Sequence, residues 1–317
     1  MHIVLTDAST VTDGDLDLSV FEQFGRVTVY PLSDRDETKE RIADADAVLI
    51  NKTVLDADVL AAAPRLRYIG LFATGYNVID LDTCRARGIT VCNAGSYSTD
   101  AVAQTVFAFL LHHYSRVADY SAFVAGGGWI ASPTFSPFVF PTAELAGKTL
   151  GIFGYGTIGR RVAVIARAFG MEVLAVPHRP DQPSDGIARM TDLDTMLATA
   201  DAVTVHCPLT EETRGLFNAA AFARCKDGAF FINTSRGGVV VEEDLRAALT
   251  SGKLSGAGLD VLTTEPMAPD CPLLGAKNAV FTPHVAWAPL ETRRRLLGVV
   301  TDNLQNFLAG HPTHVIV

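Results

Sequence analysis

A strand, a glycine turn, a helix and a second strand follow one another in residues 149–180, TLGIFGYGTIGRRVAVIARAFGMEVLAVPHRP, and this order restricts the fold more than any other feature. Gly154, Gly156 and Gly159 form a GxGxxG pattern between the first apolar run and the helix. The first glycine permits a tight turn, the second lets a phosphate approach the backbone, and the third lets helix and strand pack closely. Because the turn opens at a helix N-terminus, it favours anionic groups. The pattern predicts a parallel βαβ unit that binds a dinucleotide, and the alternative is a glycine turn that serves packing alone.

Short apolar runs alternate with helix-length polar segments along almost the whole chain. HIVLT, RVTVY, AVLI, RYIGLF and ITVC form a first series, and TLGIFG, MEVLAV, DAVTVH, AFFINTS, LSGAGLD and NAVFTPH form a second. Runs of this length, rich in valine and isoleucine, are typical of buried strands in parallel sheets. A chain of 317 residues is long enough for two such sheets, each with its own core. We therefore predict an α/β protein with two doubly wound, Rossmann-like domains.

The segment between the two series, from Thr99 to about Gly126, is apolar at helical spacing and is predicted to be a helix that bridges the domains. The arm that follows, residues 126–141 (GGGWIASPTFSPFVFP), is too apolar for a solvated linker. Such an arm packs on a second subunit or folds back on its own domain, and both alternatives stay open. The last helix, PLETRRRLLGVVTDNLQNFLAG, is expected to return to the first domain, which would make that domain discontinuous.

Charge and composition exclude several classes of protein. The net charge of −9 argues against a nucleic-acid partner, because such binding needs a basic face. The longest apolar helix candidate, AVAQTVFAFLL, is too short to span a bilayer, and the N-terminus shows no export signal, so we expect a cytoplasmic protein without membrane contact. The five cysteines form no CxxC pair and no zinc-ligand spacing, so we expect reduced thiols and no metal site.

Four polar side chains lie at or just past the ends of predicted strands in the sheet that holds the glycine turn: Arg236, Asp260, Glu265 and His284. Carboxyl ends of parallel strands form one binding crevice, so these side chains can converge. An arginine can bind a carboxylate with its forked guanidinium, while a histidine donates a proton to a carbonyl oxygen as hydride reaches the carbon. Glu265 would favour the charged imidazole and keep the acid protonated. Each residue alone is more often a solvated ion pair or a structural histidine, but together they predict the reduction of a keto acid.

Six motifs spread over nearly the whole chain strengthen this interpretation: GYNVIDLDTCRARGITVCNAGSYSTDAVAQ, ELAGKTLGIFGYGTIGR, HCPLTEETRGLFN, INTSRGG, GAGLDVLTTEP and TPHVAWA. With these motifs the chain resembles the D-isomer-specific 2-hydroxyacid dehydrogenases. ATGYN and HVAWA narrow the resemblance to the glycerate dehydrogenase or hydroxypyruvate reductase branch. The resemblance implies a substrate domain of residues 1–99 and 288–317, a dinucleotide-binding domain of residues 100–287, and a homodimer built on the bridging helix and the arm.

The resemblance also implies roles for individual residues. Arg236 would bind the substrate carboxylate and carbonyl, His284 would be the acid/base, and Glu265 would pair with His284. Asp260 would lie by the nicotinamide, and Lys52 is a candidate substrate contact, with a solvated side chain as the alternative. The cofactor phosphates would contact Gly154, Tyr155, Gly156, Thr157, Ile158 and Gly159. The adenosine side of the cofactor would contact His206, Cys207 and Pro208, and the nicotinamide side would contact Thr234 and Ser235. The substrate carboxylate would be bound by the backbone around Ala73, Thr74 and Gly75.

Pro177 stands eighteen residues after Gly159, where relatives selective for NAD carry an aspartate. That acidic residue accepts hydrogen bonds from the ribose of NAD and repels the extra phosphate of NADP. In its absence Arg179, helped by His178, can meet a 2′-phosphate with charge-assisted hydrogen bonds. We predict NAD(P)(H) as the cofactor, with NADP(H) favoured; the alternative is a solvated Arg179 and indifferent use of both cofactors.

The combined prediction is an oxidoreductase that reduces a small 2-keto acid, such as hydroxypyruvate or glyoxylate, to D-glycerate or glycolate. A dinucleotide-sensing regulatory protein, like the co-repressor relatives of the same fold, is the alternative from another class. The sequence shows no disordered tail or basic extension, which speaks against that alternative. A same-fold dehydrogenase of phosphite or formate is a third possibility, although GYN and HVAW resemble the hydroxyacid branch more closely.

Overall fold

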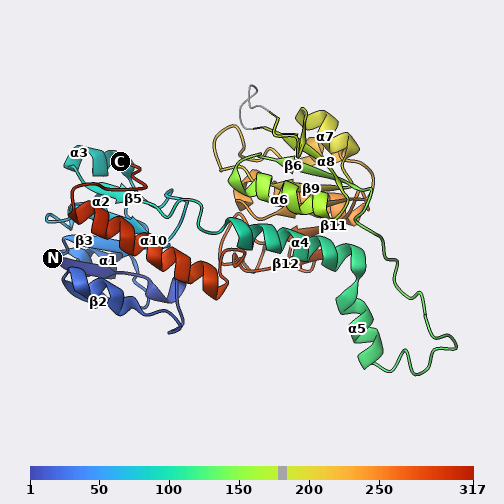
Figure 1. Cartoon of the computed structure of the whole chain (residues 1–317), viewed down its shortest axis with the longest axis horizontal. Helices are drawn as coiled ribbons and strands as arrows, with labels where there is room; N and C mark the ends of the chain where they lie inside the picture. The colour runs from blue at the N-terminus through green and yellow to red at the C-terminus, as the bar shows by residue number, and fades with distance from the viewer. Residues whose placement is uncertain (178–183) are drawn as a thin grey trace. The chain divides into compact units, whose positions relative to one another are not determined.

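The computed structural model describes residues 1–177 and 184–317 of the chain. They form two compact units, the first from Met1–Ser98 and Ala288–Val317 and the second from Thr99–Trp287. Each unit is built on a sheet of parallel strands (Figure 1), which confirms the predicted α/β class with two Rossmann-like sheets. The assignment of one unit to the substrate and the other to the cofactor stays a prediction.

The first unit contains a five-stranded sheet in the order β2-β1-β3-β4-β5. Its three central strands are buried because each is a run of apolar residues with helices on both faces of the sheet. The order reverses between β1 and β3, the point at which open α/β sheets form their crevice. The strands are β1 His2–Leu5, β2 Arg26–Val29, β3 Ala47–Ile50, β4 Tyr68–Leu71 and β5 Thr90–Cys92.

The helices of the first unit begin and end at recognisable signals. α1 begins with a capping box between Asp34 and Glu37, and α3 ends at Gly88, whose φ of 66° suits glycine. α10 packs on β4, where the ring centroids of Phe307 and Tyr68 are 4.8 Å apart. The elements are η1 Ala8–Thr10, η2 Leu18–Phe24, α1 Arg35–Ile42, α2 Ala57–Ala61, α3 Leu81–Arg87 and α10 Leu290–Leu308.

The second unit contains a seven-stranded sheet in the order β12-β11-β10-β9-β6-β7-β8. Here the order reverses between β6 and β9, so the glycine turn that follows β6 lies at the reversal point, as ligand-binding turns do in such sheets. The strands are β6 Thr149–Phe153, β7 Glu172–Val176, β8 Arg189–Met190, β9 Ala202–Val205, β10 Ala229–Asn233, β11 Leu254–Leu259 and β12 Ala279–Phe281.

Two hydrophobic cores lie on the two faces of this sheet. One core includes Phe107 of α4 and Val162 of α6, and the other includes Met196, Phe222 and Leu245 from α7, α8 and α9. This double cover explains why the strands are apolar throughout rather than alternating. The helices are α4 Thr99–Ser115, α5 Val117–Ala125, α6 Thr157–Ala168, α7 Leu193–Thr199, α8 Ala219–Arg224, α9 Glu242–Thr250 and the short η3 Gly237–Val239.

α5 and the arm extend away from the sheet of the second unit (Figure 1). Every residue of α5 is at least partly exposed. In the arm, Ile130, Phe135 and Phe138 are 92%, 91% and 93% exposed. The arm therefore lies outside the core of its own unit, with these three side chains in solvent.

Candidate active site

The glycine turn between β6 and α6 shows why each glycine is needed. Gly154 has a φ of 95°, and a Cβ there would lie 2.7 Å from the backbone carbonyl of His206. A Cβ on Gly159 would lie 2.3 Å from the backbone oxygen of Gly154, so only glycine lets α6 pack on the turn. At Gly156, by contrast, no described atom lies within 4 Å of such a Cβ, and no described side chain caps α6. Open space beside a helix N-terminus without a side-chain cap fits a pyrophosphate.

Thr157 and Ile158 form the first turn of α6, next to this space. Tyr155 differs from them, because its side chain is buried and its hydroxyl donates to the carboxylate of Asp185, with oxygen–oxygen distances of 3.0 and 3.1 Å. Burial and the contact with this carboxylate raise the pKa of the Tyr155 hydroxyl, so it stays protonated. A cofactor contact of Tyr155 must therefore come from its backbone.

The residues after β9 lie against the glycine turn. The backbone N–H of His206 donates to Phe153 O at 2.7 Å, and the Nε2 atom of His206 is hydrogen-bonded to the hydroxyl of Thr204 at 3.0 Å. Burial lowers the pKa of His206 to about 3 and raises the pKa of Cys207 to about 11, so both side chains are neutral near neutral pH. The next residue, Pro208, is exposed. These three residues thus add no charge beside the turn.

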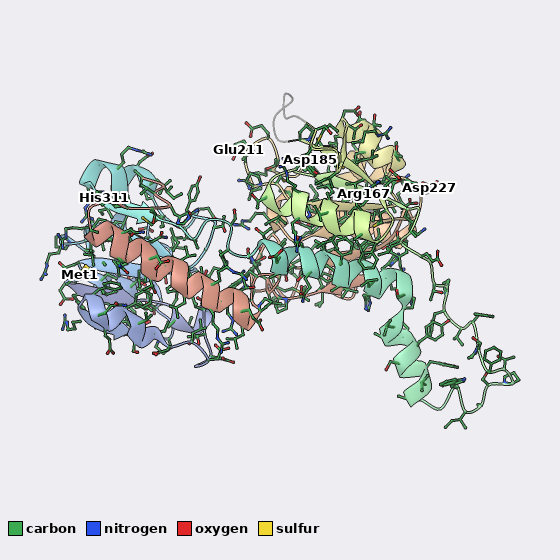
Figure 2. All side chains as sticks on the ribbon, in the orientation of Figure 1. Met1, Arg167, Asp185, Glu211, Asp227 and His311 are labelled. Atoms are coloured by element: carbon green, nitrogen blue, oxygen red, sulfur yellow. The ribbon has the colours of Figure 1, made fainter. Side chains whose placement is uncertain are left out.

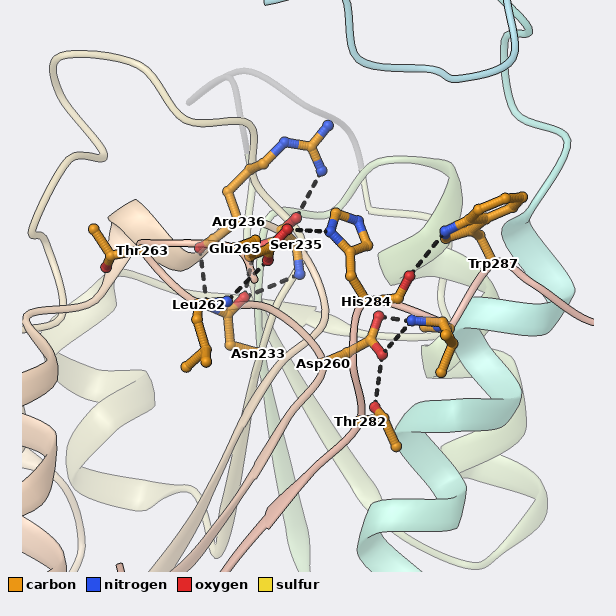
Figure 3. A network of polar contacts seen from close by, with 12 residues as sticks. Asn233, Ser235, Arg236, Asp260, Leu262, Thr263, Glu265, Thr282, His284 and Trp287 are labelled. Atoms are coloured by element: carbon orange, nitrogen blue, oxygen red, sulfur yellow. Dashed lines mark hydrogen bonds and ion pairs between the residues drawn. The ribbon is translucent and has the colours of Figure 1, made fainter. Parts of the chain in front are cut away.

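Arg236 lies in the loop after β10, and its neighbours fix that loop (Figure 3). The buried side chain of Asn233 donates to the backbone oxygen of Arg236 at 2.9 Å and accepts from the N–H of Ser235 at 3.0 Å. A Cβ on Gly237 would lie 1.9 Å from the backbone carbon of Leu262, so glycine here brings the loop directly against the segment that follows β11. The guanidinium donates to Ser235 O at 2.7 Å, and no described carboxylate forms an ion pair with it.

His284 lies in the turn after β12 with a φ of 55°, a left-handed conformation that is uncommon for residues other than glycine. Its backbone N–H donates to Asp260 O at 2.7 Å, and its carbonyl accepts from the indole N–H of Trp287 at 2.9 Å. Its ring Nδ1 donates to Glu265 Oε2 at 2.7 Å, and the other oxygen of that carboxylate accepts from the N–H of Leu262 at 3.0 Å. The contact at Nδ1 orients the ring, so Nε2 is the nitrogen that can face a substrate.

Asp260, directly after β11, holds the turn that carries His284 (Figure 3). Asp260 is 2% exposed. Its carboxylate accepts hydrogen bonds from Thr282 Oγ1 at 2.6 Å, Val285 N–H at 2.8 Å and Ala286 N–H at 3.0 Å. Burial raises the pKa of this carboxyl, and the hydrogen bonds that it accepts oppose the shift. The hydrogen bonds of the Asp260 carboxylate thus hold the segment that carries His284, and its contact with a nicotinamide stays a prediction.

Thr234 and Ser235 follow β10 but differ in their hydrogen bonding. The hydroxyl of Ser235 donates to Asn233 Oδ1 at 2.9 Å. The hydroxyl of Thr234 is buried and has no hydrogen-bond partner among the described residues. An unsatisfied buried hydroxyl costs about 1–3 kcal/mol, so Thr234 marks a place where a bound polar group would stabilise the protein.

The other residues predicted to contact the substrate belong to the first unit. The backbone N–H groups of Asn51, Lys52 and Thr53 donate to the buried carboxylate of Asp7 at 3.0, 2.6 and 2.8 Å. The side chain of Lys52 is exposed. The loop after β4, which is hydrogen-bonded to residues 93–95, holds Ala73, Thr74 and Gly75. Their role in substrate binding stays a prediction.

Pro177 directly follows β7, whereas the predicted contacts of His178 and Arg179 lie outside the described residues. The described end of the same loop holds Asp185 (Figure 2), whose carboxylate lies 3.3 Å from Nε of Arg160. Neither Asp185 nor Arg160 was predicted to take part in the site. A single aspartate in a polar loop forms no sequence pattern, and only the folded chain brings it to the glycine turn.

Other features of the second unit are less suited to the predicted chemistry. A cavity of about 380 Å³ is lined by His113, Lys148 and Lys226 among others and lies at the amino ends of the strands, away from the glycine turn.

Within residues 1–177 and 184–317, no cluster of three or more His, Cys, Asp and Glu side chains is arranged to hold a metal ion. No helix in the described part of the chain is long and apolar enough to cross a membrane.

Comparisons with known proteins agree on one family. Residues 107–286 match the NAD binding domain of the D-isomer specific 2-hydroxyacid dehydrogenases. The chain is 42% identical over 320 residues to a hydroxypyruvate reductase of Blautia hydrogenotrophica, which covers 100% of this chain and 99% of that protein. It is 38% identical over 283 residues to a glycerate dehydrogenase of Methylorubrum extorquens, or 89% of this chain and 88% of that protein. A solved acyclic imino acid reductase in complex with NADPH and D-arginine is 28% identical, with a TM-score of 0.88 and 100% of both chains covered. These names favour an enzyme over the regulatory alternative.

Proposed function

The chain belongs to the D-isomer-specific 2-hydroxyacid dehydrogenase family, and we propose that it reduces a small 2-keto acid to the D-2-hydroxy acid with a nicotinamide cofactor. The proposed substrates are hydroxypyruvate and glyoxylate, which would give D-glycerate and glycolate. Support comes from the two relatives named hydroxypyruvate reductase and glycerate dehydrogenase, which match most of the chain.

The observation that carries the proposal is the contact of 2.7 Å between His284 Nδ1 and Glu265 Oε2. A carboxylate on Nδ1 fixes the orientation of the ring, so Nε2 is the nitrogen that would donate a proton to a carbonyl oxygen. Because the carboxylate of Glu265 is itself held by the N–H of Leu262 at 3.0 Å, the pair is oriented before a substrate arrives. In the reverse direction the neutral ring accepts the hydroxyl proton.

Arg236 is proposed to bind the carboxylate of the keto acid. Its guanidinium uses one hydrogen bond on Ser235 O and has no ion-pair partner among the described carboxylates, so further donors remain for an anionic ligand. A planar guanidinium can bind both oxygens of a carboxylate at once, which would orient the substrate carbonyl. Asn233 donates to the backbone oxygen of Arg236 and accepts from the N–H of Ser235, and these two bonds hold the loop in place for this contact.

The residues of the second unit fit a bound dinucleotide. The open space at Gly156 and the helix N-terminus behind it would hold the pyrophosphate, and the unsatisfied hydroxyl of Thr234 would bind a polar group nearer the reacting end. When bound, the nicotinamide supplies the hydride that reaches the carbonyl carbon of the substrate. We further propose that NADPH is preferred, since Pro177 puts no carboxylate directly after β7 to repel a 2′-phosphate. The NADPH complex of a related reductase supports this proposal.

The arm is proposed to pack on a second copy of the chain in a homodimer. Ile130, Phe135 and Phe138 of the arm are almost fully exposed in the single chain, and such patches on soluble proteins are typically covered by a partner. Replacing Phe135 and Phe138 by serine should shift the protein from dimer to monomer in light scattering. A protein that is monomeric before the change would contradict the proposed dimer.

A direct assay tests the proposed function. Oxidation of NADPH and of NADH is followed on addition of hydroxypyruvate, glyoxylate, pyruvate, phosphite and formate, with His284→Ala as the control for background turnover. We expect oxidation with hydroxypyruvate and glyoxylate that depends on His284. No oxidation with any keto acid, or oxidation that survives in His284→Ala, would contradict the proposal.

A further inference from the structure

Two neighbouring arginines on α6, Arg160 and Arg161, contact different segments of the second unit. Their side chains are almost equally exposed, at 49% and 47%. Arg161 forms an ion pair through Nε with Asp100 at the start of α4, at 2.7 Å. Arg160 instead points to the loop after β7, where its Nε lies 3.3 Å from Asp185 Oδ2. The two residues therefore share chemistry and exposure but face different surroundings.

The surroundings of Arg160 are the end of β7 and the glycine turn. Gly154 N–H donates to Val176 O at 3.2 Å, which places the turn beside the last residue of β7. In dinucleotide-binding units the adenosine ribose lies at the end of this second strand. Asp185 belongs to the loop after β7, and its carboxylate accepts from the hydroxyl of Tyr155 in the glycine turn. Its contact with Arg160 therefore places the guanidinium beside this turn.

Asp185 does not replace the missing ribose-binding acid. Its side chain is 17% exposed, and its carboxylate already accepts from the hydroxyl of Tyr155 at 3.0 Å and from the N–H of Ile187 at 3.0 Å, besides contacting Arg160. A partly buried carboxylate with these partners has little capacity left for ribose hydroxyls. Its contact with Nε instead orients the guanidinium, which also lies over the ring of Tyr155, 5.7 Å from the centroid.

We propose that Arg160 is a specificity-determining residue whose Nη1 and Nη2 groups donate to the 2′-phosphate of NADPH, while Asp185 and Tyr155 hold the guanidinium from behind. The proposal rests on the proposed use of a nicotinamide dinucleotide. Because Asp185 contacts Nε of Arg160, the Nη1 and Nη2 groups remain for a phosphate. These two groups can bind a phosphate bidentately. NADH offers only ribose hydroxyls at this place, so Arg160 distinguishes the two cofactors.

The test compares Arg160→Ala with its matched control Arg161→Ala in the otherwise intact protein. Dissociation constants for NADPH and NADH are measured by the fluorescence of the reduced cofactor, without substrate. Arg160→Ala should weaken NADPH about tenfold to hundredfold, the size expected for hydrogen bonds to a charged group, and NADH by less than about threefold. Arg161→Ala should change neither constant by more than about twofold. Arg160→Lys should restore part of the NADPH affinity, because it keeps the charge but not the fork.

An equal loss for both cofactors in Arg160→Ala, or no loss for either, would overturn the proposal. The same holds if Arg161→Ala shows the same preference as Arg160→Ala. The outcome is independent of the proposed substrate: if no keto acid is reduced but Arg160→Ala still weakens NADPH alone, the substrate proposal fails and the role of Arg160 stands. Conversely, if the protein reduces a keto acid but Arg160→Ala weakens NADPH and NADH equally, the proposed function stands and Arg160 does not determine the cofactor preference.

Discussion

The two units have the same sheet architecture, but they differ in the residues that lie where the strand order reverses. In the first unit, Asp7 follows β1 and its carboxylate accepts the backbone N–H groups of residues 51–53, which follow β3. In the second unit, the residue directly after β6 is Gly154, and the turn that it begins leaves open space at Gly156. In the first sheet the chain's own carboxylate thus occupies the position at the reversal point, whereas in the second sheet no described side chain fills the space at Gly156.

The arginines show the same contrast. Arg293 on α10 of the first unit is bound bidentately by Asp15, with both nitrogen–oxygen distances 2.6 Å. Arg236 of the second unit has no ion pair with any carboxylate in the described part of the chain. Shared topology therefore does not imply shared function, because the chemistry depends on which polar groups the chain leaves without an internal partner.

The largest effect is expected for the acid/base of the second unit. General acid catalysis contributes about a hundredfold to ten-thousandfold, so His284→Ala should lose that much in kcat, while the dissociation constant for NADPH changes little. His311→Ala, an exposed histidine of the first unit, is the control. Near wild-type kcat in His284→Ala with hydroxypyruvate would show that the proton comes from another group.

In the first unit the largest effect is expected on stability. Asp7→Ala removes the acceptor of three buried N–H groups and should lower the free energy of unfolding by about 2–4 kcal/mol. Asp13→Ala, an exposed neighbour, should change it by less than about 0.5 kcal/mol. The measurement is urea unfolding followed by circular dichroism. Equal midpoints for the two variants would mean that the first sheet does not depend on its internal carboxylate.

Arg236→Lys tests whether Arg236, which forms no ion pair with a described carboxylate, binds the substrate. A lysine keeps the charge but cannot bind both oxygens of a carboxylate, so kcat/KM for hydroxypyruvate should fall about tenfold to hundredfold through a higher KM and a lower kcat together. The thermal midpoint should stay close to that of the unmodified protein. Unchanged kcat/KM would place the substrate carboxylate on another residue.

Two glycines with positive φ allow the turns of the two units to be compared directly. Gly154→Ala would place a Cβ 2.7 Å from the carbonyl of His206, whereas no described atom lies within 4 Å of a Cβ on Gly14 of the first unit, at φ 106°. Both variants should cost about 1–3 kcal/mol in backbone strain. Only Gly154→Ala should also weaken the binding of NADPH, measured by fluorescence titration. Equal NADPH affinity in both variants would contradict the assignment of the turn.

The smallest effect is expected from the Arg293–Asp15 ion pair of the first unit. The hydrogen bond from Arg293 is the largest cause that lowers the pKa of Asp15, from 3.8 to about 2. A depressed folded-state pKa gives a stabilisation that is present above the unfolded pKa and lost as pH falls between about 4 and 2. The difference in unfolding free energy between the unmodified protein and Asp15→Asn should therefore shrink over this range. A difference that does not vary with pH would remove the ion pair as its cause.

The fold was predictable because it depends on local patterns. The apolar runs and the glycine turn predicted both parallel sheets, and strand ends predicted Arg236, Glu265 and His284 as neighbours in one crevice. His284 and Glu265 are nineteen residues apart and do form the expected contact. Their catalytic roles stay proposals.

The supporting contacts were not predictable, because most join residues distant in sequence and depend on the path of a loop. Asp7 reaches N–H groups 44 to 46 residues away, and Tyr155 reaches Asp185 across 30 residues. Asn233 is only three residues from Arg236, whose backbone oxygen it binds. An asparagine at the end of a buried strand nevertheless forms no sequence pattern that predicts this hydrogen bond. The arrangement of N–H donors around one carboxylate exists only after the sheet has formed.

Amide hydrogen exchange on the whole protein, with and without NADPH, tests the contrast between the two reversal points most directly. We predict that NADPH slows exchange at Gly156, Thr157 and Ile158, because the cofactor covers the N-terminus of α6. The amides of residues 51–53 should exchange slowly in both states, because Asp7 already binds them. Protection by NADPH at residues 51–53 without protection at the glycine turn would contradict the account.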